Sequence, residues 1–445
     1  MKKKSLTFLV LVLVASFLLT GCSHAFSDWL AEQLYGSAGE EIQTESPGEI
    51  TDLTPVEAEE PVEAPTLQPT LQPTIEEEPL ITVVEEDDST AAEEEVIPEE
   101  GLAETVAEED QTDSYAYSML NVDEQRLYME ILTILRTMSS DITISSRDTN
   151  QIDKVFKSVM IDHPEIFYVQ GYSMTKMTRG GVLNKITLSG TYSMSQSEKI
   201  EKEQQAIAAA AAILNGMPGG MSEYDKVKYV YEYLVRNTEY DINSEQNQNI
   251  LSVFLNGRTV CQGYAKAAQY LLNQSGIFCT LAEGVVKGNE PHVWNVVRID
   301  GKYYNVDVTW GDASYNISGA DALSGMAGVP DINYDYLNVP DSMIRSTHMV
   351  QSPITLPVCD SMDANYYVRE GIYFTEFDEN KLAQLFADAY ATGESSVQVK
   401  CADANVYQAF FQHLITDEKI FDYLNGGSSV RYVEMKEQLS MLFYL

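Results

Sequence analysis

Residues 291–308 read PHVWNVVRIDGKYYNVDV, two strand-like halves on either side of a turn signal. β-Branched and aromatic residues dominate both of its halves, which is typical of strands. Asp300 and Gly301 between the halves are a strong signal for a two-residue type I′ turn. The stretch therefore predicts an antiparallel hairpin with strands at 291–299 and 302–308.

The two-residue turn also determines which residues of the hairpin face each other. It places His292 opposite Thr309, and Asp307 lies two residues earlier on the return strand. His292 and Asp307 are then diagonal neighbours on one face, within side-chain reach. A slip of one residue would send the two side chains to opposite faces. The turn thus builds a pair in which Asp307 orients an imidazole that can take or return a proton.

A second stretch carries a cysteine at a helix start. Residues 256–265 read NGRTVCQGYA, in which Thr259 and Gln262 have capping-box spacing before a helix expected to run to about Asn273, with Cys261 in its first turn. In the first helical turn, unpaired N–H groups and the positive end of the helix dipole stabilise a thiolate. The same N–H groups are suitably placed to donate hydrogen bonds to an oxyanion. The alternative is that Cys261 is a small buried core residue.

Cys261, His292 and Asp307 together have the residue types of a nucleophilic cysteine site. Such chemistry requires a thiolate, an imidazole within hydrogen-bond reach and a carboxylate that holds the imidazole tautomer. The same three side chains could ligate zinc, but the sequence shows no fourth ligand. We therefore expect neither a metal nor another cofactor. A coincidental cysteine beside a structural His–Asp hairpin remains the alternative interpretation.

Residues from about 222 to 312 resemble the transglutaminase-like core, a papain-like superfamily of cysteine enzymes. The resemblance rests on three motifs in the same order, VCQGYA at 260–265, PHVWN at 291–295 and NVDVTW at 305–310. A trailing segment from Tyr336 to His348 also resembles a piece common in bacterial members. The similar region makes up about a quarter of the chain.

The resemblance implies an α+β fold in which a helix-borne cysteine packs on an antiparallel sheet. It implies Cys261 as nucleophile, His292 as general base and acid, and Asp307 as the orienting carboxylate. Animal transglutaminases carry a tryptophan after the cysteine, where this chain has Gln262. Calcium-activated cross-linking is therefore not carried over to this chain.

Three further residues are candidates for the oxyanion site or the cleft. Gln262 either holds the helix cap or assists the oxyanion, and the sequence does not separate the two roles. Tyr240, in a Tyr-Asp pair that resembles one often seen before the nucleophile helix, either lines the cleft or packs the core. Trp294 lies beside the His–Asp pair and is expected to shield it from water.

The first 22 residues predict export. Three lysines precede an apolar run from Leu6 to Leu19, and Thr20-Gly21-Cys22 follows. The run is short for a membrane span and fits a signal peptide at 1–21. Its end resembles the bacterial lipobox, which implies a lipid on Cys22. An uncleaved anchor is the alternative, and both place the rest of the chain outside the cytoplasm, held at the cell membrane.

The charge of the chain is concentrated in one segment. The 445 residues carry a net charge of −40, and residues 23–113 contain 28 of the 68 acids without a single Lys or Arg. This segment is rich in Glu, Pro, Thr and Ala and buries too little apolar surface to offset its ordering entropy. We predict a disordered tether at 22–113. No cationic track for a phosphate backbone is evident, so no nucleic-acid partner is expected.

Three folded modules are expected after the tether. They are an N-terminal α+β module at 114–215, the transglutaminase-like domain at 216–350 and a small α/β module at 360–445. In the first module the patterns predict helices at 121–138, 149–161 and 195–214 and strands at 166–170, 172–178 and 183–192. In the last module they predict strands at 366–374, 395–401 and 430–434 and helices at 379–390 and 406–413.

Besides Cys22 and Cys261, the chain has Cys279, Cys359 and Cys401. Four cysteines outside the signal region do not make a dense disulfide framework. A bridge between Cys359 and Cys401 is one option, and the sequence alone does not decide it.

These observations predict a cell-surface cysteine enzyme that acts on an amide or isopeptide bond of a protein or cell-wall peptide. An acyl-thioester on Cys261 would be resolved by water, giving hydrolysis, or by an amine, giving transfer. The alternative is a non-catalytic binding scaffold that retains the fold. Neither the oligomeric state nor the choice between hydrolysis and transfer follows from the sequence.

Overall fold

The computed structural model describes residues 56–57, 80–85, 114–286, 288–312, 332–426, 429–436 and 438–445. All of them belong to one compact unit, residues 53–445. The predicted signal peptide, Cys22 and most of the predicted tether lie outside the described residues. In the part that is described, no helix is both long and apolar enough to cross a membrane. The predicted module boundaries stay predictions.

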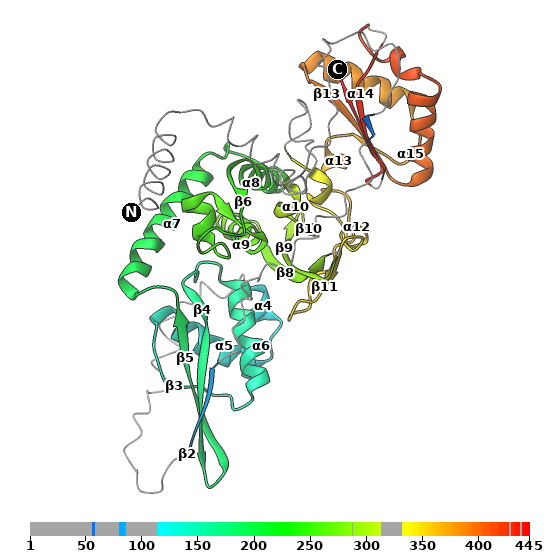
Figure 1. Cartoon of the computed structure of the whole chain (residues 1–445). Coiled ribbons are helices and arrows are strands. Elements are labelled where there is room, and N and C mark those ends of the chain that lie inside the picture. The colour runs from blue at the N-terminus through cyan, green and yellow to red at the C-terminus, as the bar shows by residue number, and fades with distance from the viewer. Residues whose placement is uncertain are drawn as a thin grey trace, which may run out of the picture. The chain divides into compact units, whose positions relative to one another are not determined.

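The helices of the N-terminal part, which Figure 1 shows, begin at polar capping residues. Each of the three long helices is preceded by a polar residue whose side chain accepts from backbone N–H groups of the first turn, which replaces the missing intrahelical partner. The predicted helices are confirmed with small shifts at their ends. The caps Asn121, Asp148 and Ser195 precede α5 (Val122–Thr137), α6 (Thr149–Asp162) and α7 (Gln196–Asn215), and the short α4 (Tyr115–Ser118) comes before them.

A four-stranded sheet accompanies these helices. Its order is β2-β4-β5-β3, with β2 (Leu80–Glu85), β4 (Val169–Arg179), β5 (Val182–Tyr192) and β3 (Ile142–Thr143). The predicted strand at 166–170 is wrong, because β4 begins at Val169 and passes an irregularity before Gly171 without a break. The predicted disorder is also wrong for residues 56–57 and 80–85. The first two pair in parallel with a strand of the C-terminal sheet, and the β-branched run at 80–85 pairs in parallel with β4 as an edge strand.

The second sheet contains the hairpin. Its order is β10-β9-β8-β11, with β8 (Cys279–Val286), β9 (Glu290–Ile299), β10 (Lys302–Val306) and β11 (His348–Val350). The register is the predicted one, since Ile299 pairs with Lys302 and Asn295 pairs with Val306. Asp300 and Gly301 have φ values of 50° and 78°, as a type I′ turn requires.

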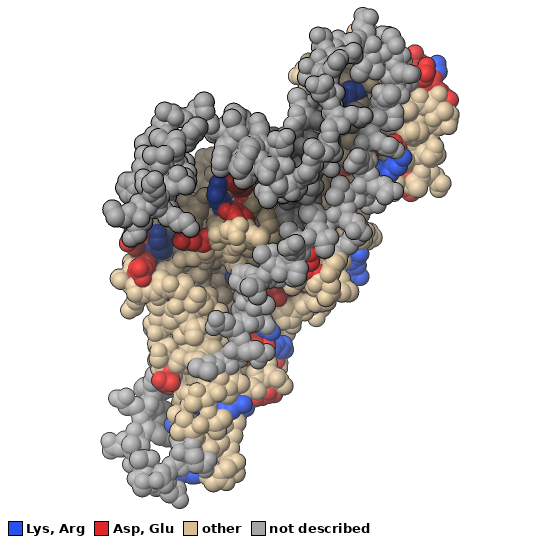
Figure 2. Space-filling model, viewed as in Figure 1, with Lys and Arg blue, Asp and Glu red and all other residues tan. Residues whose placement is uncertain are grey.

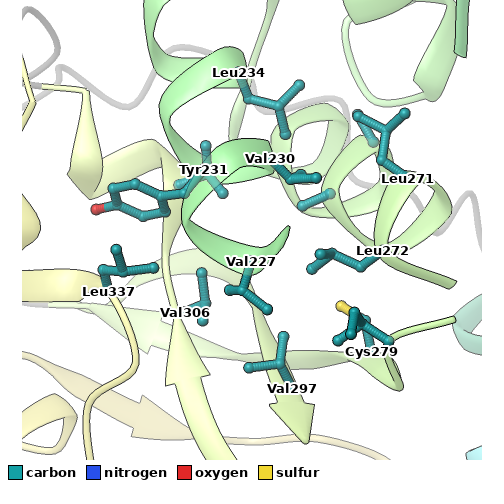
Figure 3. Packing of buried hydrophobic residues seen from close by; sticks show 14 of the residues in the cluster. Val227, Val230, Tyr231, Leu234, Leu271, Leu272, Cys279, Val297, Val306 and Leu337 are labelled. Atoms are coloured by element: carbon teal, nitrogen blue, oxygen red, sulfur yellow. The ribbon is translucent and has the colours of Figure 1, made fainter. Parts of the chain in front are cut away.

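Two helices pack against this sheet and form its apolar core. They are α8 (Glu223–Asn237) and α9 (Cys261–Gln274). Figure 3 shows side chains from both helices gathered with side chains of the strands, and burial of each large aliphatic group contributes about 1.5–3 kcal/mol. The core residues labelled there include Val227, Val230, Tyr231 and Leu234 of α8, Leu271 and Leu272 of α9, and Cys279, Val297 and Val306 of the strands.

Short elements connect the helices and strands of this region. β6 (Glu239–Tyr240) pairs in parallel with β7 (Arg258–Thr259) just before α9. The remaining short elements are the π-helix η2 (Ser252–Asn256), the helices α10 (Val308–Gly311) and α12 (Asp341–Ile344), and the 3-10 helix η3 (Tyr334–Tyr336).

The C-terminal residues form an α/β arrangement around a five-stranded sheet. The order is β1-β14-β15-β13-β12, and α14 (Glu379–Thr392) and α15 (Ala404–Phe411) follow the predicted helices closely. After α15 come η4 (Gln412–Thr416) and η5 (Lys419–Asp422). The strands are β1 (Val56–Glu57), β12 (Tyr373–Phe374), β13 (Ser396–Cys401), β14 (Tyr432–Met435) and β15 (Ser440–Tyr444).

Two predictions for the C-terminal residues are corrected. The expected strand at 366–374 is instead the helical turn α13 (Tyr366–Arg369) followed by the two-residue β12, because the Asn365 side chain caps a helical turn. The sequence analysis also missed β15, which pairs with both β13 and β14. Cys279, Cys359 and Cys401 are free thiols, so the optional Cys359–Cys401 bridge is not formed.

We expect Leu234→Ala to lower the free energy of unfolding by about 2–5 kcal/mol, because the residue is 0% exposed and its truncation leaves a cavity. Ile200→Ala is the matched control. Ile200 is 56% exposed, so its loss should change stability by no more than about 0.5 kcal/mol. Denaturant unfolding measures both, and equal losses would contradict the assigned core.

Candidate active site

The candidate nucleophile lies at the start of a helix, as the sequence predicts. Cys261 is the first residue of α9, after the extended N-cap Val260. The expected capping box is not formed, since no side chain caps this helix. Thr259 Oγ1 instead donates to the carbonyl of Asn247 (2.7 Å) and lies 2.6 Å from Ser252 Oγ. The fully buried hydroxyl therefore ties down the preceding loop, because burial without such partners would be costly.

Gly263 allows the loop to lie close under the helix start. A Cβ atom at this position would lie 1.8 Å from Thr259 Oγ1 and 3.0 Å from both the Asn247 carbonyl oxygen and Ser252 Oγ. Any side chain would therefore push the loop away from α9. The Cys-Gln-Gly motif thus places the thiol through backbone packing as well as through the helix itself.

Cys261 is partly exposed, and its side chain lies close enough to the imidazole of His292 to raise the pKa of that ring. The first N–H groups of α9 have no intrahelical partner and point out of the same helix end. A carbonyl oxygen beside the sulfur would find these donors, and the positive end of the helix dipole would favour negative charge there.

The predicted His–Asp contact is present. His292 Nε2 donates to Asp307 Oδ2 at 2.8 Å, and both side chains are buried. The predicted return strand ends two residues early, at Val306, and the expected pairing of His292 with Thr309 is not formed. The reason is local, since Asp307 caps the short helix α10 by accepting the N–H of Trp310 at 3.1 Å.

The surroundings favour the charged forms of both side chains, the imidazolium of His292 and the carboxylate of Asp307. Burial lowers the pKa of His292, but the Asp307 carboxylate and its hydrogen bond, together with Cys261, raise it to about 10. Burial raises the pKa of Asp307, but His292 and His348 hold it well below its usual range. His292 is therefore an imidazolium at neutral pH. Its contribution to stability is full below its ordinary pKa and is lost as the pH rises through about 10.

The sequence analysis missed one residue of the site, His348. Its Nε2 donates to the same Asp307 Oδ2 at 3.0 Å, from strand β11. His348 is 41 positions from Asp307, and no turn fixes their registry. The only available signal was its place at the end of the trailing segment that resembles bacterial members.

His292, Asp307 and His348 are three buried groups with ligand atoms within 4.8 Å of one another. Ligand atoms on a tetrahedral zinc ion, each about 2.0–2.1 Å from the metal, would be about 3.3 Å apart. The separations of 2.8 and 3.0 Å from Oδ2 are instead those of charge-assisted hydrogen bonds. We interpret the group as a proton-bridged network.

The other three candidate residues, Gln262, Tyr240 and Trp294, lie in different surroundings. Gln262 is buried, and its Oε1 has no hydrogen-bond partner among the described residues. Tyr240, in β6, packs against the apolar core, which favours the packing interpretation. Trp294 is fully buried behind His292, with the two rings 6.3 Å apart and nearly parallel. Its Nε1 donates to Asn305 (3.0 Å), so it is not available to an oxyanion.

Comparison with known proteins supports the assignment of the fold. Residues 211–308 match the model of the transglutaminase-like superfamily. The kyphoscoliosis peptidases of Mus musculus and Homo sapiens are 24% identical over 106 residues, which cover 20% of this chain and 16% of theirs. The chain thus spans about a sixth of the length of these curated relatives.

A solved structure described as a TGase covers 32% of this chain and 44% of its own at 18% identity, with a TM-score of 0.23. At that score the likeness has no bearing on activity. Residues 211–308, which contain Cys261, His292 and Asp307, are thus similar to the transglutaminase-like superfamily, and the described residues combine helices with antiparallel sheets, as an α+β fold does.

We expect His292→Ala to slow alkylation of Cys261 by iodoacetamide at about pH 6 by about tenfold or more, because the imidazolium stabilises the thiolate. Peptide mass spectrometry measures the rate at each cysteine. Burial raises the pKa of Cys279 and Cys359, so these thiols are slow internal references.

His413→Ala is the matched control for this measurement. Its Nε2 lies 2.7 Å from the Tyr423 hydroxyl, and it belongs to η4 in the C-terminal sheet region. The control should alkylate at the wild-type rate. Equal rates for wild type and His292→Ala would show that the two side chains do not form a reactive pair.

Proposed function

We propose that this protein is a cysteine enzyme that cleaves or transfers at an amide or isopeptide bond of a protein or peptide. The observation that carries the proposal is the place of His292 between two partners, a hydrogen bond to Asp307 on one side and the Cys261 side chain on the other, both of which raise its pKa. A thiol at a helix start, an imidazole and a buried carboxylate are the three groups that thiolate catalysis needs. The match to the transglutaminase-like superfamily supports it.

Acylation begins with the Cys261 thiolate. The sulfur attacks the carbonyl carbon, and the carbonyl oxygen gains the negative charge beside the first N–H groups of α9. The carbon–nitrogen bond then breaks, and the leaving amine takes the proton from His292. Because Asp307 holds Nε2, the nitrogen of His292 that serves the sulfur and the amine is Nδ1. The product is an acyl-thioester on Cys261 and a neutral imidazole.

Deacylation reverses these roles. His292, now neutral, takes a proton from the incoming water or amine, which attacks the thioester carbon. The carbon–sulfur bond breaks, and the thiolate returns beside the reformed imidazolium. Water gives a carboxylic acid, whereas an amine gives a new amide or isopeptide bond. Asp307 keeps its charge throughout and orients the ring.

The location of the enzyme is part of the proposal. Lys2 to Cys22 support export and lipid attachment, and the acidic segment that follows would hold the catalytic part away from the membrane. This location favours proteins or cell-wall peptides as substrates. On the face shown in Figure 2, acidic and basic side chains are interspersed over the described residues, which is unlike the basic stripe of a nucleic-acid-binding protein.

Wild type and Cys261→Ala should be incubated with cell-wall peptides, with casein and with a labelled primary amine. We expect the wild type to release an amine product or to incorporate the label, and Cys261→Ala to do neither. Intact mass spectrometry also detects an acyl adduct on the wild type. Failure of the wild type to give a product or adduct would leave the binding-scaffold interpretation in its place.

For the anchor, we expect Cys22→Ser to release the protein from membranes into the soluble fraction, because it removes the sulfur that would carry the lipid. Fractionation and immunoblotting of cells that express each form measure this. Cys279→Ser is a control that keeps the signal region intact and should stay with the membrane. Retention of Cys22→Ser would contradict lipid attachment and favour the uncleaved anchor.

A further inference from the structure

We propose that His348 is a positioning residue of this site, which donates its Nε2–H to Asp307 and thereby holds the carboxylate against His292. The inference rests on the proposed function, because it concerns the same Cys261 thiol. It adds a fourth side chain, contributed by a separate strand, to the three that the sequence predicts.

The hydrogen bonds of Asp307 show why a second imidazole matters. Its side chain is 0% exposed and has no access to water. Oδ1 accepts the N–H of Trp310 at 3.1 Å, and Oδ2 accepts from His292 at 2.8 Å and from His348 at 3.0 Å. Removal of one donor from a buried carboxylate leaves a charged acceptor partly unsatisfied, which is strongly unfavourable.

The sheet register brings His348 to the correct face. On β8, Gly284 pairs with His292 of β9 on one side and with Val350 of β11 on the other. His348 pairs with Val286, two residues further along β8. Side chains two residues apart on a strand point to the same face. His292 and His348 therefore project to the same side of the sheet, where Asp307 lies between them.

Gly284 permits the close approach of β11. A Cβ atom there would lie 2.1 Å from the carbonyl oxygen of Met349 and 3.1 Å from the ring of Trp294. A real side chain would have to displace the strand that carries His348. The position of the His348 imidazole thus depends on the absence of a side chain at Gly284.

His348 is held in place by rings and by one hydroxyl. It is buried, and its ring lies 4.9 Å from Trp310, 5.1 Å from Trp294 and 5.9 Å from Tyr336, between ring centroids. Thr347 Oγ1 lies 2.8 Å from Nδ1. A carboxylate only accepts, so Nε2 carries the proton and Nδ1 accepts from the hydroxyl. The ring is therefore fixed in one tautomer, aimed at Asp307.

The two histidines differ in charge. Burial lowers the pKa of His348, and the charge of His292 lowers it further, which together outweigh the effect of Asp307. His348 is thus a neutral donor beside the imidazolium of His292. The other titratable groups are Cys261, which faces His292, and Tyr231 and Tyr336, which face Asp307. Burial raises the pKa of both tyrosines, so they stay neutral.

This arrangement predicts a specific effect on pH dependence. Without the donor of His348, the Asp307 carboxylate is held less firmly against His292, and the imidazolium then loses its proton at a lower pH. A residue that only fills space would leave the pH at which His292 loses its proton unchanged.

His348→Phe keeps a ring of similar size without the N–H donor, and His348→Gln supplies an amide N–H in its place. The titration of the His292 ring should be followed by NMR of histidine-labelled protein from about pH 5 to about pH 11 for both variants and for wild type. We expect the proton-binding constant of His292 to fall about tenfold in His348→Phe, and His348→Gln to recover most of this loss. In His413→Phe, altered in the C-terminal sheet region, His292 should titrate as it does in the wild type.

An unchanged His292 titration in folded His348→Phe would overturn the positioning role. Where circular dichroism shows that His348→Phe does not fold, Thr347→Val replaces it, because loss of the Nδ1 partner should displace the titration in the same direction. An unchanged titration in that variant would likewise overturn the role. Failure of the wild type to form a product or an acyl adduct would instead contradict the proposed function itself, so the two failures are distinguishable.

Discussion

The structure of this site depends on one buried charge, the carboxylate of Asp307. An ionised carboxylate without water is stable only when fixed donors surround it, because burial of an unpaired charge is very costly. Here the donors come from three places in the chain, the hairpin strand β9, the first turn of α10 and the edge strand β11. Because the buried carboxylate is stable only with all of these donors, the hairpin, the short helix and the distant strand meet at one point.

The proposed nucleophile is positioned by a different kind of constraint. Cys261 begins α9, and α9 is held on the sheet by the apolar core that it shares with α8. Close packing of the preceding loop against Gly263 sets where the helix starts. The apolar core therefore sets the position of the Cys261 sulfur, and the Asp307 carboxylate sets the position of the His292 imidazole. The two side chains come together where helix α9 meets the sheet. This separation allows the thiol to be partly exposed while its partners stay buried.

Much of this arrangement could be predicted because its signals are local. The Asp300–Gly301 turn determines the hairpin register through backbone conformation alone, and polar caps determine most helix starts. Predictions were wrong where tertiary partners overrode the pattern. Thr259 bonds to the loop instead of capping α9, and an Asn365 cap replaces the expected strand with a helical turn. Strand β15 has no strong local signal and is stabilised by pairing with two neighbours.

The sequence predicts the helix-borne Cys261, the His292–Asp307 contact and the resemblance of residues 222–312 to the transglutaminase-like core, because a turn, a helix start and short motifs act over a few residues. The place of His348 beside them follows only from the fold. It requires the distant strand β11 to pair with β8 at Gly284, which leaves room for it. The physical reason is that register within a hairpin is local, whereas register between separate strands is set by packing.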